Sequence, residues 1–259
     1  DQSLAWRVPR NALLWSPANV GPLACAAQVV TVHDVAALDH PQWQSAAFGA
    51  WYRWLTPRLV RRVRAVLAVS EFTRQRLLAH TGMAPERVHV VPNGVDQRFS
   101  PRDPQALQAG LAALSLPSKR YVLTVGSIEP RKNLATLLQA WSGILPQLPP
   151  DVWLVVAGMK GASHIHRDAL GGKALPPRVH LPGHVPDDLL PDLYAGAMCF
   201  AYPSLYEGFG LPPLEAMASG VAVLSSATTA IPESVGDAGL AVEPSAPEAV
   251  GQALLARGG

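Results

Sequence analysis

Apolar and polar positions follow two alternating periods along the chain. Short runs rich in Val, Leu and Ala predict buried strands. The segments between them carry apolar residues three or four positions apart, which predicts helices. Strands alternating with helices favour parallel sheets covered by helices on both faces, so the expected fold class is α/β. The expected strands are residues 13–15, 28–34, 65–70, 87–92, 121–126, 152–158, 179–183, 197–201, 221–225 and 240–242.

Helices are expected between these strands, with polar residues at some of their starts. Ser70 is expected to cap one helix and Asp187 another, because short polar side chains accept hydrogen bonds from the first free amides. Asn93-Gly94-Val95-Asp96 is typical of a turn. The expected helices are residues 45–64, 71–80, 134–145, 187–197, 214–218, 231–235 and 247–257.

The alternation restarts after a proline-punctuated stretch at residues 101–117, which predicts a linker with one weak helix. We therefore expect two domains, residues 1–98 and 99–259. The chain begins with Asp1 and ends just after a helical pattern, so both ends are expected to be cuts and the first domain to be incomplete.

Composition narrows the classes of function. The 259 residues are 49% apolar and carry a formal net charge of +2, too little to indicate nucleic-acid binding. Cys25 and Cys199 both lie in apolar surroundings and are expected to be buried thiols, which favours a reducing cytoplasm. No apolar run is long enough to span a bilayer.

The stretch from Tyr202 to Gly220 organises the rest of the chain. An apolar run leads into two glycines, Gly208 and Gly210, and then Pro212 and Pro213 are expected to open a short helix. Glycine has no Cβ, so backbone amides can approach a ligand closely. The start of a helix carries partial positive charge that suits a phosphate.

Two carboxylates flank this loop. Glu207 precedes the glycines, and Glu215, separated from it by seven residues, is expected in the first turn of the helix. One carboxylate can reach hydroxyls beyond a bound phosphate and the other can reach hydroxyls on its near side, which is the layout of a nucleotide-sugar. An isolated pair at this spacing is more often a cap on a surface helix, so the surrounding residues decide.

Those residues, Pro203 to Gly220, closely resemble the signature of the retaining GT-B glycosyltransferases of family 4, and the resemblance extends through nearly the whole chain. In that family the first glutamate contacts the donor sugar and the second contacts the ribose, while loop amides hold the sugar and the pyrophosphate. The resemblance implies these roles for Glu207, Glu215, and the loop residues Gly208, Phe209, Gly210 and Leu211.

Arg131 and Lys132 follow an expected strand and Gly126. Two cations at the carboxyl end of a strand would stabilise a departing pyrophosphate, although an isolated Arg-Lys pair usually lies on a solvated loop. The sequence around them resembles the family's phosphate-binding loop. Many members carry Arg directly after the glycine, where this chain has Ser127. Either Arg131 supplies the second charge or the site has one cation fewer.

Other candidates come from the resemblance. His33 ends a strand and matches the family's N-domain histidine beside the donor sugar, with Asp34 as a possible companion. Gly158 and Lys160, together with the turn containing Val185, are similar to the walls that bind the nucleotide base. Ser70 and Arg74 could also face the cleft that lies between the two domains in this family, though a simple helix cap is the safer interpretation of Ser70.

The helical segment from Trp51 to Arg64 combines aromatic residues with arginines. Such a helix could dock on an anionic membrane. A helix packed through its aromatics, with a solvated basic face, is the simpler interpretation.

The resemblance implies a GT-B fold, in which two Rossmann-like domains face each other across a cleft. It implies a metal-independent enzyme without a cofactor that moves a hexose, mannose-like as in bacterial polysaccharide synthesis, from a GDP- or UDP-linked donor to a glycan or lipid-linked acceptor. Cytoplasmic location, with possible peripheral contact at the inner face of the membrane, follows as an expectation. A nucleotide-sugar 2-epimerase of the same fold and a non-catalytic nucleotide-sugar-binding protein remain as alternatives.

Overall fold

The computed structural model describes residues 9, 11–158 and 174–258, and the chain folds into two compact units. The N-terminal unit contains the residues up to Asn93 together with Glu207–Phe209, and the C-terminal unit contains Gly94–Tyr206 and the residues from Gly210 onward. All strand pairings in the described part of both units are parallel, so the expected α/β class with two parallel sheets is confirmed.

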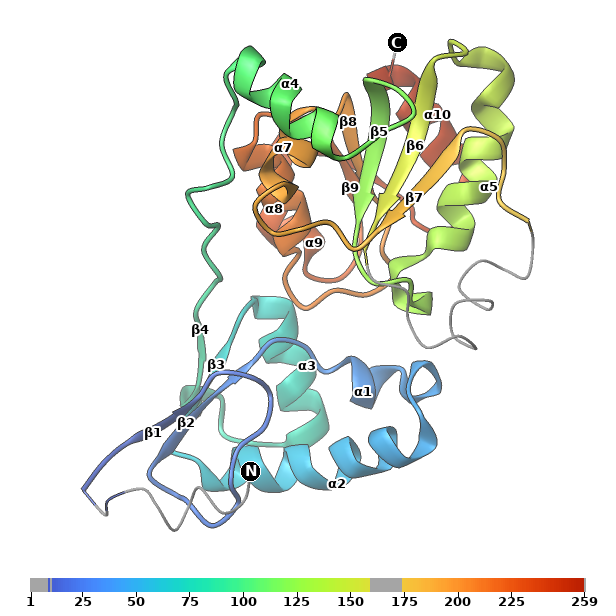
Figure 1. Cartoon of the computed structure of the whole chain (residues 1–259). Coiled ribbons are helices and arrows are strands. Elements are labelled where there is room, and N and C mark those ends of the chain that lie inside the picture. The colour runs from blue at the N-terminus through green and yellow to red at the C-terminus, as the bar shows by residue number, and fades with distance from the viewer. Residues whose placement is uncertain (1–8, 10, 159–173, 259) are drawn as a thin grey trace. The chain divides into compact units, whose positions relative to one another are not determined.

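The N-terminal unit is built on a four-stranded sheet in the order β1-β2-β3-β4 (Figure 1). Val and Ala side chains of β2 and β3 pack with Leu55, Leu59 and Val60, so burial of this apolar stripe fixes the longest helix of the unit. The strands are β1 (Leu14–Ser16), β2 (Gln28–Val32), β3 (Ala65–Ala68) and β4 (Val88–Val90), and the helices are α1 (Ala36–Asp39), α2 (Ala46–Arg62) and α3 (Glu71–Thr81).

Serine caps begin both longer helices of this unit. Ser45 Oγ accepts a hydrogen bond from the Phe48 amide at 3.3 Å, and Ser70 Oγ accepts one from the Thr73 amide at 3.0 Å. The predicted cap at Ser70 is therefore confirmed. Gly82 ends α3 with φ +59°, a left-handed conformation that glycine adopts without strain.

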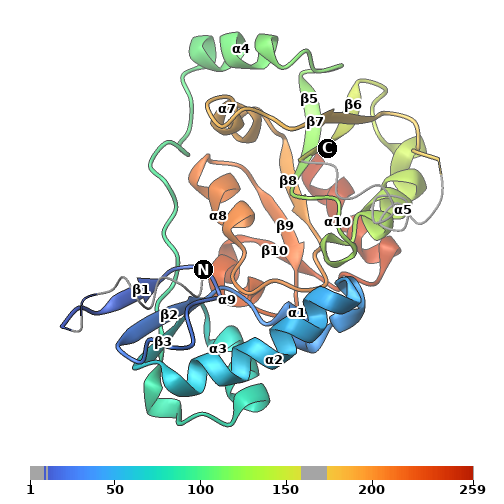
Figure 2. The ribbon, with the colours of Figure 1, turned by 60° about the horizontal axis from the view of Figure 1, so that its bottom comes forward.

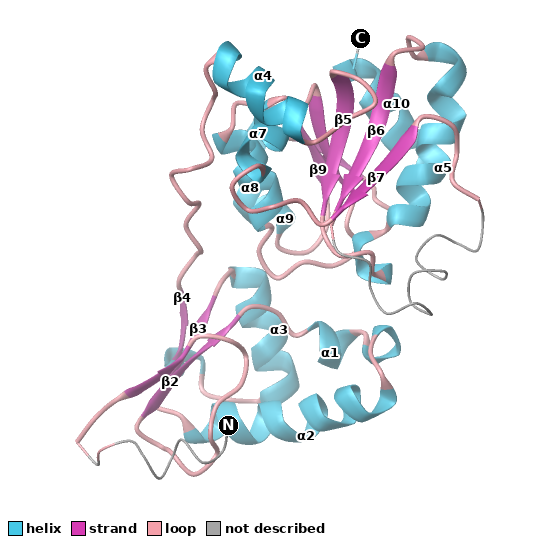
Figure 3. Ribbon diagram, in the orientation of Figure 1, coloured by secondary structure: helices cyan, strands magenta, loops and turns pink. Residues whose placement is uncertain are grey.

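The C-terminal unit is built on a six-stranded sheet in the order β10-β9-β8-β5-β6-β7. Its strands are labelled in Figure 2, and Figure 3 draws strands in magenta. The strands are β5 (Arg120–Val125), β6 (Val152–Ala157), β7 (Val179–Gly183), β8 (Cys199–Tyr202), β9 (Val223–Ser226) and β10 (Leu240–Val242). The helices are α4 (Pro104–Ala113), α5 (Leu134–Ile144), α7 (Leu190–Ala195), α8 (Leu211–Ala218), α9 (Ile231–Val235) and α10 (Pro247–Gly258).

Successive side chains of β5 and β6 point to opposite faces of this sheet, as strand geometry requires. Val122 packs with α5 and α10, whereas Tyr121 and Leu123 pack with α7, α8 and α9. Figures 1 and 2 both place α5 and α10 side by side. The sheet is thus covered by helices on both faces.

Three local predictions are wrong. Asn93–Asp96 forms no turn, and the chain turns at Gln97–Arg98 instead. Asp187 caps no helix, because α7 begins at Leu190 and no side chain caps it. Cys25 is partly exposed, while Cys199 is buried as expected. Among the described residues, no helix is both long and apolar enough to cross a bilayer.

Candidate functional site

The carboxyl ends of β5, β6 and β7 lie side by side; Gly126 and Gly158 directly follow β5 and β6, and Gly183 is the last residue of β7. The Gly126 amide donates to the Ala157 carbonyl at 2.9 Å, and the Gly158 amide donates to the Gly183 carbonyl at 2.8 Å. Gly158 has φ +149°, and a Cβ built there would lie 1.9 Å from the Gly126 carbonyl oxygen. Only glycine allows this approach. The backbone that follows β5 and β6 is therefore free of side chains at the carboxyl end of the sheet, where α/β sheets bind ligands.

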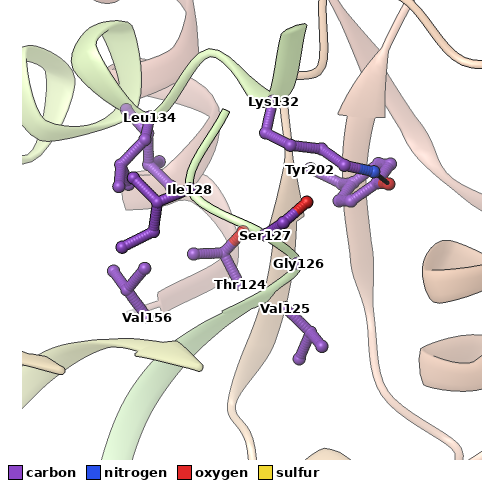
Figure 4. Close-up of a pocket in the computed structure, with 10 residues that line it drawn as sticks. Thr124, Val125, Gly126, Ser127, Ile128, Lys132, Leu134, Val156 and Tyr202 are labelled. Atoms are coloured by element: carbon purple, nitrogen blue, oxygen red, sulfur yellow. Dashed lines mark hydrogen bonds between the residues drawn. The ribbon is translucent and has the colours of Figure 1, made fainter. Parts of the chain in front are cut away.

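A 3₁₀ turn, Pro130–Lys132, brings a lysine to the same edge. Lys132 Nζ donates to the Tyr202 hydroxyl at 2.5 Å and lies 4.9 Å from the centre of the Tyr202 ring. Figure 4 shows the Lys132 side chain extended across to Tyr202, beside Gly126 and Ser127. Gly126, Ser127, Lys132 and Tyr202 line one small pocket of about 20 Å³, room for about one water molecule. Lys132 and Gly126, both candidates from the sequence, therefore lie at the same pocket.

Arg131 is engaged within its own loop. Its Nε donates to Glu129 Oε2 at 2.9 Å, and Ser127 Oγ donates to Glu129 Oε1 at 2.7 Å. Burial raises the pKa of Glu129, but hydrogen bonds from Ser127 and Arg131 and the charges of Arg131 and Lys132 outweigh it, so the pKa lies below its ordinary value. Glu129 stays ionised and offsets one cation, which leaves the loop Ser127–Lys132 with a net charge of +1.

Asn133 fixes this loop, a role that the sequence analysis did not predict. It is buried, has φ +58°, and its Nδ2 donates to the carbonyls of Pro203 at 2.9 Å and Pro244 at 2.6 Å. Its Oδ1 accepts from Thr136 Oγ1 at 2.7 Å. Asn is enriched at left-handed positions, which is the sequence signal that could have marked it. The loop after β5 is thereby tied to the segment after β8.

Helix α8 begins earlier than predicted. Gly210 is its N-cap residue with φ +102°, and Leu211 is the first helical residue. Pro212 and Pro213 follow as the second and third residues and have no N–H, so the first turn offers an anion fewer amide donors than a helix normally does. A Cβ at Gly210 would lie 2.7 Å from Ile231 Cδ1, which explains the glycine by close packing against α9.

Glu215 is the fifth residue of α8, so the prediction that it lies in the first turn is wrong. Its Oε2 accepts a hydrogen bond from the Tyr194 hydroxyl at 2.8 Å. Partial burial raises the pKa of Glu215. The Tyr194 hydrogen bond and the charge of Arg98 act in the opposite direction, and Asp96 adds to the rise. A half-buried carboxylate whose pKa is raised by desolvation is typical of a functional position.

The remaining candidates divide between the units. Glu207, Gly208 and Phe209 lie in the loop between β8 and α8. Val185 follows β7 and is buried among apolar side chains of the C-terminal unit, so its side chain belongs to the core. Lys160 lies outside the described residues.

In the N-terminal unit, His33 follows β2 and is exposed. Its Nε2 lies 2.7 Å from the Pro17 carbonyl, which can only accept a hydrogen bond, so Nε2 carries the proton. Asp34 Oδ1 accepts from the Ala36 amide at 3.0 Å, next to the start of α1. Arg74 donates to the Val88 carbonyl and to Glu71, which gives it a structural role within the unit.

Part of the site is thus assembled at one edge of the C-terminal sheet. Gly126, Gly158, Lys132 and the residues flanking α8 all follow strands at their carboxyl ends. Tyr194 and Tyr202, which the sequence analysis did not single out, contact two of the predicted site residues. In the described part of the chain, no three His, Cys, Asp or Glu side chains gather as metal ligands.

Two models of glycosyltransferase families match this chain. The profile of the family described as Glycosyl transferases group 1 matches residues 112–256, and that of Glycosyltransferase Family 4 matches residues 12–99. The O-antigen chain mannosyltransferase B of Escherichia coli is 32% identical over 233 residues, which cover 88% of this chain and 60% of that protein. This chain thus spans less than two thirds of that relative.

Solved structures share the fold. The HepE protein of Anabaena, solved in complex with UDP-glucose, superposes with a TM-score of 0.70 at 20% identity and covers 87% of this chain and 60% of its own. WaaG, a glycosyltransferase involved in lipopolysaccharide biosynthesis, gives a TM-score of 0.72 at 18% identity, covering 99% of this chain and 71% of its own. The family profiles, the parallel sheets and the mannosyltransferase relative agree, and the chain belongs to the Glycosyl transferases group 1 family, with the GT-B type of α/β fold.

Proposed function

We propose that this chain forms the donor-binding part of a retaining glycosyltransferase. The reaction transfers a hexose, mannose-like, from a nucleotide-diphosphate sugar to a glycan or lipid-linked acceptor. The observation that carries the proposal is the edge of the C-terminal sheet, where Lys132 follows a glycine-ended strand and Glu215 follows the glycine loop. A cation beside backbone without side chains suits a diphosphate. A half-buried carboxylate suits the hydroxyls of a ribose.

Each residue receives a role in the breaking of the bond between the sugar and the diphosphate. Lys132 neutralises the charge that develops on the departing diphosphate, and the partial charge at the start of α8 adds to this. Arg131 is the second candidate cation, although Glu129 offsets its charge. Glu207 holds the sugar, Glu215 the ribose, and His33 is the candidate that the N-terminal unit contributes. The amides of Gly208, Phe209, Gly210 and Leu211 serve the phosphates and sugar. The amide of Gly126 is already bonded to Ala157, so Gly126 contributes room for the diphosphate, with Gly158 and the backbone at Val185 on the base side.

The relatives support this assignment at different levels of detail. The E. coli relative is named as a mannosyltransferase, which favours a mannose-like sugar. HepE was solved with UDP-glucose, which supports a nucleotide-sugar donor. UDP therefore stays beside GDP as a candidate for the nucleotide of that donor. No metal or cofactor enters the proposed reaction.

The test separates the two glutamates in the full-length enzyme. We expect Glu215→Ala chiefly to raise the KM for the donor, whereas Glu207→Ala chiefly lowers kcat, because only Glu207 is assigned to the sugar that moves. Glu248→Ala, an exposed glutamate on α10, is the control and should change neither. Equal and negligible effects of both site variants would contradict the proposal. Conversion of the donor sugar in the absence of any acceptor would favour the 2-epimerase instead.

Helix α2 supports a further part of this proposal, peripheral contact with an anionic membrane. Phe48, Trp51 and Trp54 are 44%, 48% and 43% exposed, so these three aromatics are only partly packed and present part of their surface to the surroundings. Trp51 and Trp54 stack on each other with ring centres 5.3 Å apart, and Arg58 lies 4.8 Å from the centre of the Trp54 ring.

The charges along α2 are all positive. The helix contains Arg53, Arg58, Arg61 and Arg62 and no acidic residue, and Arg64 follows it. Arg61 and Arg62 donate to backbone carbonyls, which orient these side chains without neutralising them. Exposed tryptophans beside arginines are typical of helices that lie in the interface of an anionic bilayer.

Flotation with anionic vesicles rich in phosphatidylserine tests this contact. We expect the protein to float at low salt, with binding lost in the Trp51→Ala, Trp54→Ala double variant and weakened by salt. Lys119→Ala, an exposed cation in the C-terminal unit, is the control and should bind as the wild type does. Absence of flotation at low salt would overturn this part of the proposal.

A further inference from the structure

Two buried tyrosines contact the proposed donor site from within the core. Tyr202, in β8, is 2% exposed and its hydroxyl accepts the hydrogen bond of Lys132 Nζ. Tyr194, in α7, is fully buried and its hydroxyl donates to Glu215 Oε2. Each tyrosine therefore bonds one of the two charged groups to which the proposed function assigns the diphosphate and the ribose.

The two tyrosine rings are themselves fixed by one aromatic row. Phe200 lies between them, with ring centres 5.3 Å from Tyr194 and 5.7 Å from Tyr202. Phe99 packs edge-on against Tyr194 at 5.5 Å. Offset and edge-to-face contacts of this kind hold rings in one orientation. The hydroxyls therefore occupy fixed positions, and so do the groups bonded to them.

The protonation of Tyr194 suits this role. Burial raises its pKa well above the ordinary value, and the charge and hydrogen bond of Glu215 raise it further. The phenol thus keeps its proton and remains a donor to the carboxylate. Lys132, in turn, has an acceptor in the Tyr202 hydroxyl, which faces its positive charge with an oxygen lone pair.

We propose that Tyr194 and Tyr202 are positioning residues, which hold Glu215 and Lys132 in their binding orientations before the donor arrives. The inference rests on the proposed function of those two groups. Long charged side chains lose conformational freedom when they bind a ligand, and a side chain already held in place loses less. The tyrosines do not touch the reacting atoms in this account.

The test removes only the hydroxyls. Tyr194→Phe and Tyr202→Phe keep the ring packing of the aromatic row. We expect Tyr194→Phe to weaken binding of the preferred nucleotide among GDP, UDP and ADP about tenfold, the effect typical of a hydrogen bond to a charged group. We expect Tyr202→Phe to lower kcat of the full-length enzyme about tenfold, since Lys132 acts on the departing diphosphate.

Tyr121→Phe is the matched control. Tyr121 is also fully buried, and its hydroxyl donates to the Leu193 carbonyl at 2.8 Å rather than to either charged group. Its loss should lower the melting temperature as the other two substitutions do, while nucleotide affinity and kcat stay unchanged. A purely structural role for Tyr194 and Tyr202 predicts that all three variants behave alike.

Double variants distinguish this inference from the proposed function on which it rests. If Tyr194 acts through Glu215, then adding Tyr194→Phe to Glu215→Ala should change nucleotide affinity little further. If Glu215→Ala and Lys132→Ala impair binding or turnover but the two Tyr→Phe variants match Tyr121→Phe, the positioning role is wrong and the proposed function stands. If Glu215→Ala and Lys132→Ala have no effect, the proposed function fails first.

Discussion

Gly158→Ala tests the close approach of backbone at the ends of β5 and β6. The added Cβ would lie 1.9 Å from the Gly126 carbonyl oxygen, and real Cβ atoms essentially never come closer than 3.0 Å. The two backbone segments would have to separate by at least 1.1 Å, the difference between these distances. The atom in the way is backbone and cannot rotate aside, unlike the end of a flexible side chain.

Two costs add at this position. Overpacking of this kind costs about 1–3 kcal/mol. A non-glycine residue at φ +149° adds about 1–3 kcal/mol of backbone strain. We therefore expect the free energy of unfolding to fall by about 4 kcal/mol, and the melting temperature by roughly 10 °C for a domain of this size.

Thermal and urea unfolding, followed by circular dichroism, measure this loss. Gly143→Ala is the control, because Gly143 lies within α5 and a Cβ there would meet nothing within 4 Å. That substitution should stabilise the protein by about 1 kcal/mol, since alanine is the better helix former. Equal melting temperatures for Gly158→Ala and the wild type would refute the geometry given for the strand ends.

Three further predictions concern the charged groups and their support. Lys132→Ala should weaken nucleoside diphosphate binding in calorimetry at least tenfold. Lys119→Ala should not, because Lys119 precedes β5 whereas Lys132 follows it; equal effects would contradict the role of Lys132. Because burial raises the pKa of Glu215, its ionisation opposes folding. Glu215→Gln should therefore stabilise the protein at pH 7, and this gain should vanish as the pH falls below 4.5, the ordinary pKa of a glutamate. A loss of stability at pH 7 would contradict this. Asn133→Ala removes hydrogen bonds to two carbonyls and should lower the free energy of unfolding by about 2 kcal/mol in urea titrations, while a change below about 0.5 kcal/mol would show that Asn133 does not hold the loop.

The strands and longer helices were predictable because their apolar periods match the burial that the sheets require. β5 and β6 begin and end within one residue of their predicted bounds, and Ser70 caps α3 as expected. Failures lie where tertiary contacts override local signals. Asp187 has the chemistry of a cap, but helix α7 starts three residues later, and α1 is too short for a period to mark it.

The candidate site was predictable only where local sequence carries the signal. The glycines, Lys132 and Glu215 follow from strand ends and from the resemblance. Tyr194, Tyr202 and Asn133 act across 21, 70 and up to 111 positions of sequence, so no spacing rule could pair them with their partners. The pairing of Arg131 with Glu129 is local, yet side-chain geometry was needed to show that its charge is offset.

Nucleotide binding by this chain tests the central claim most directly. Thermal shift titrations with GDP, UDP and ADP should raise the melting temperature with at least one of them. A ligand at about 100 times its Kd stabilises the folded state by about 2.7 kcal/mol, which corresponds to roughly 5–10 °C here. The account predicts that this shift is lost in Glu215→Ala and in Lys132→Ala and kept in Glu248→Ala and in Lys119→Ala. A shift that survives in both site variants, or no shift with any of the three nucleotides, would contradict the donor site assigned to this chain.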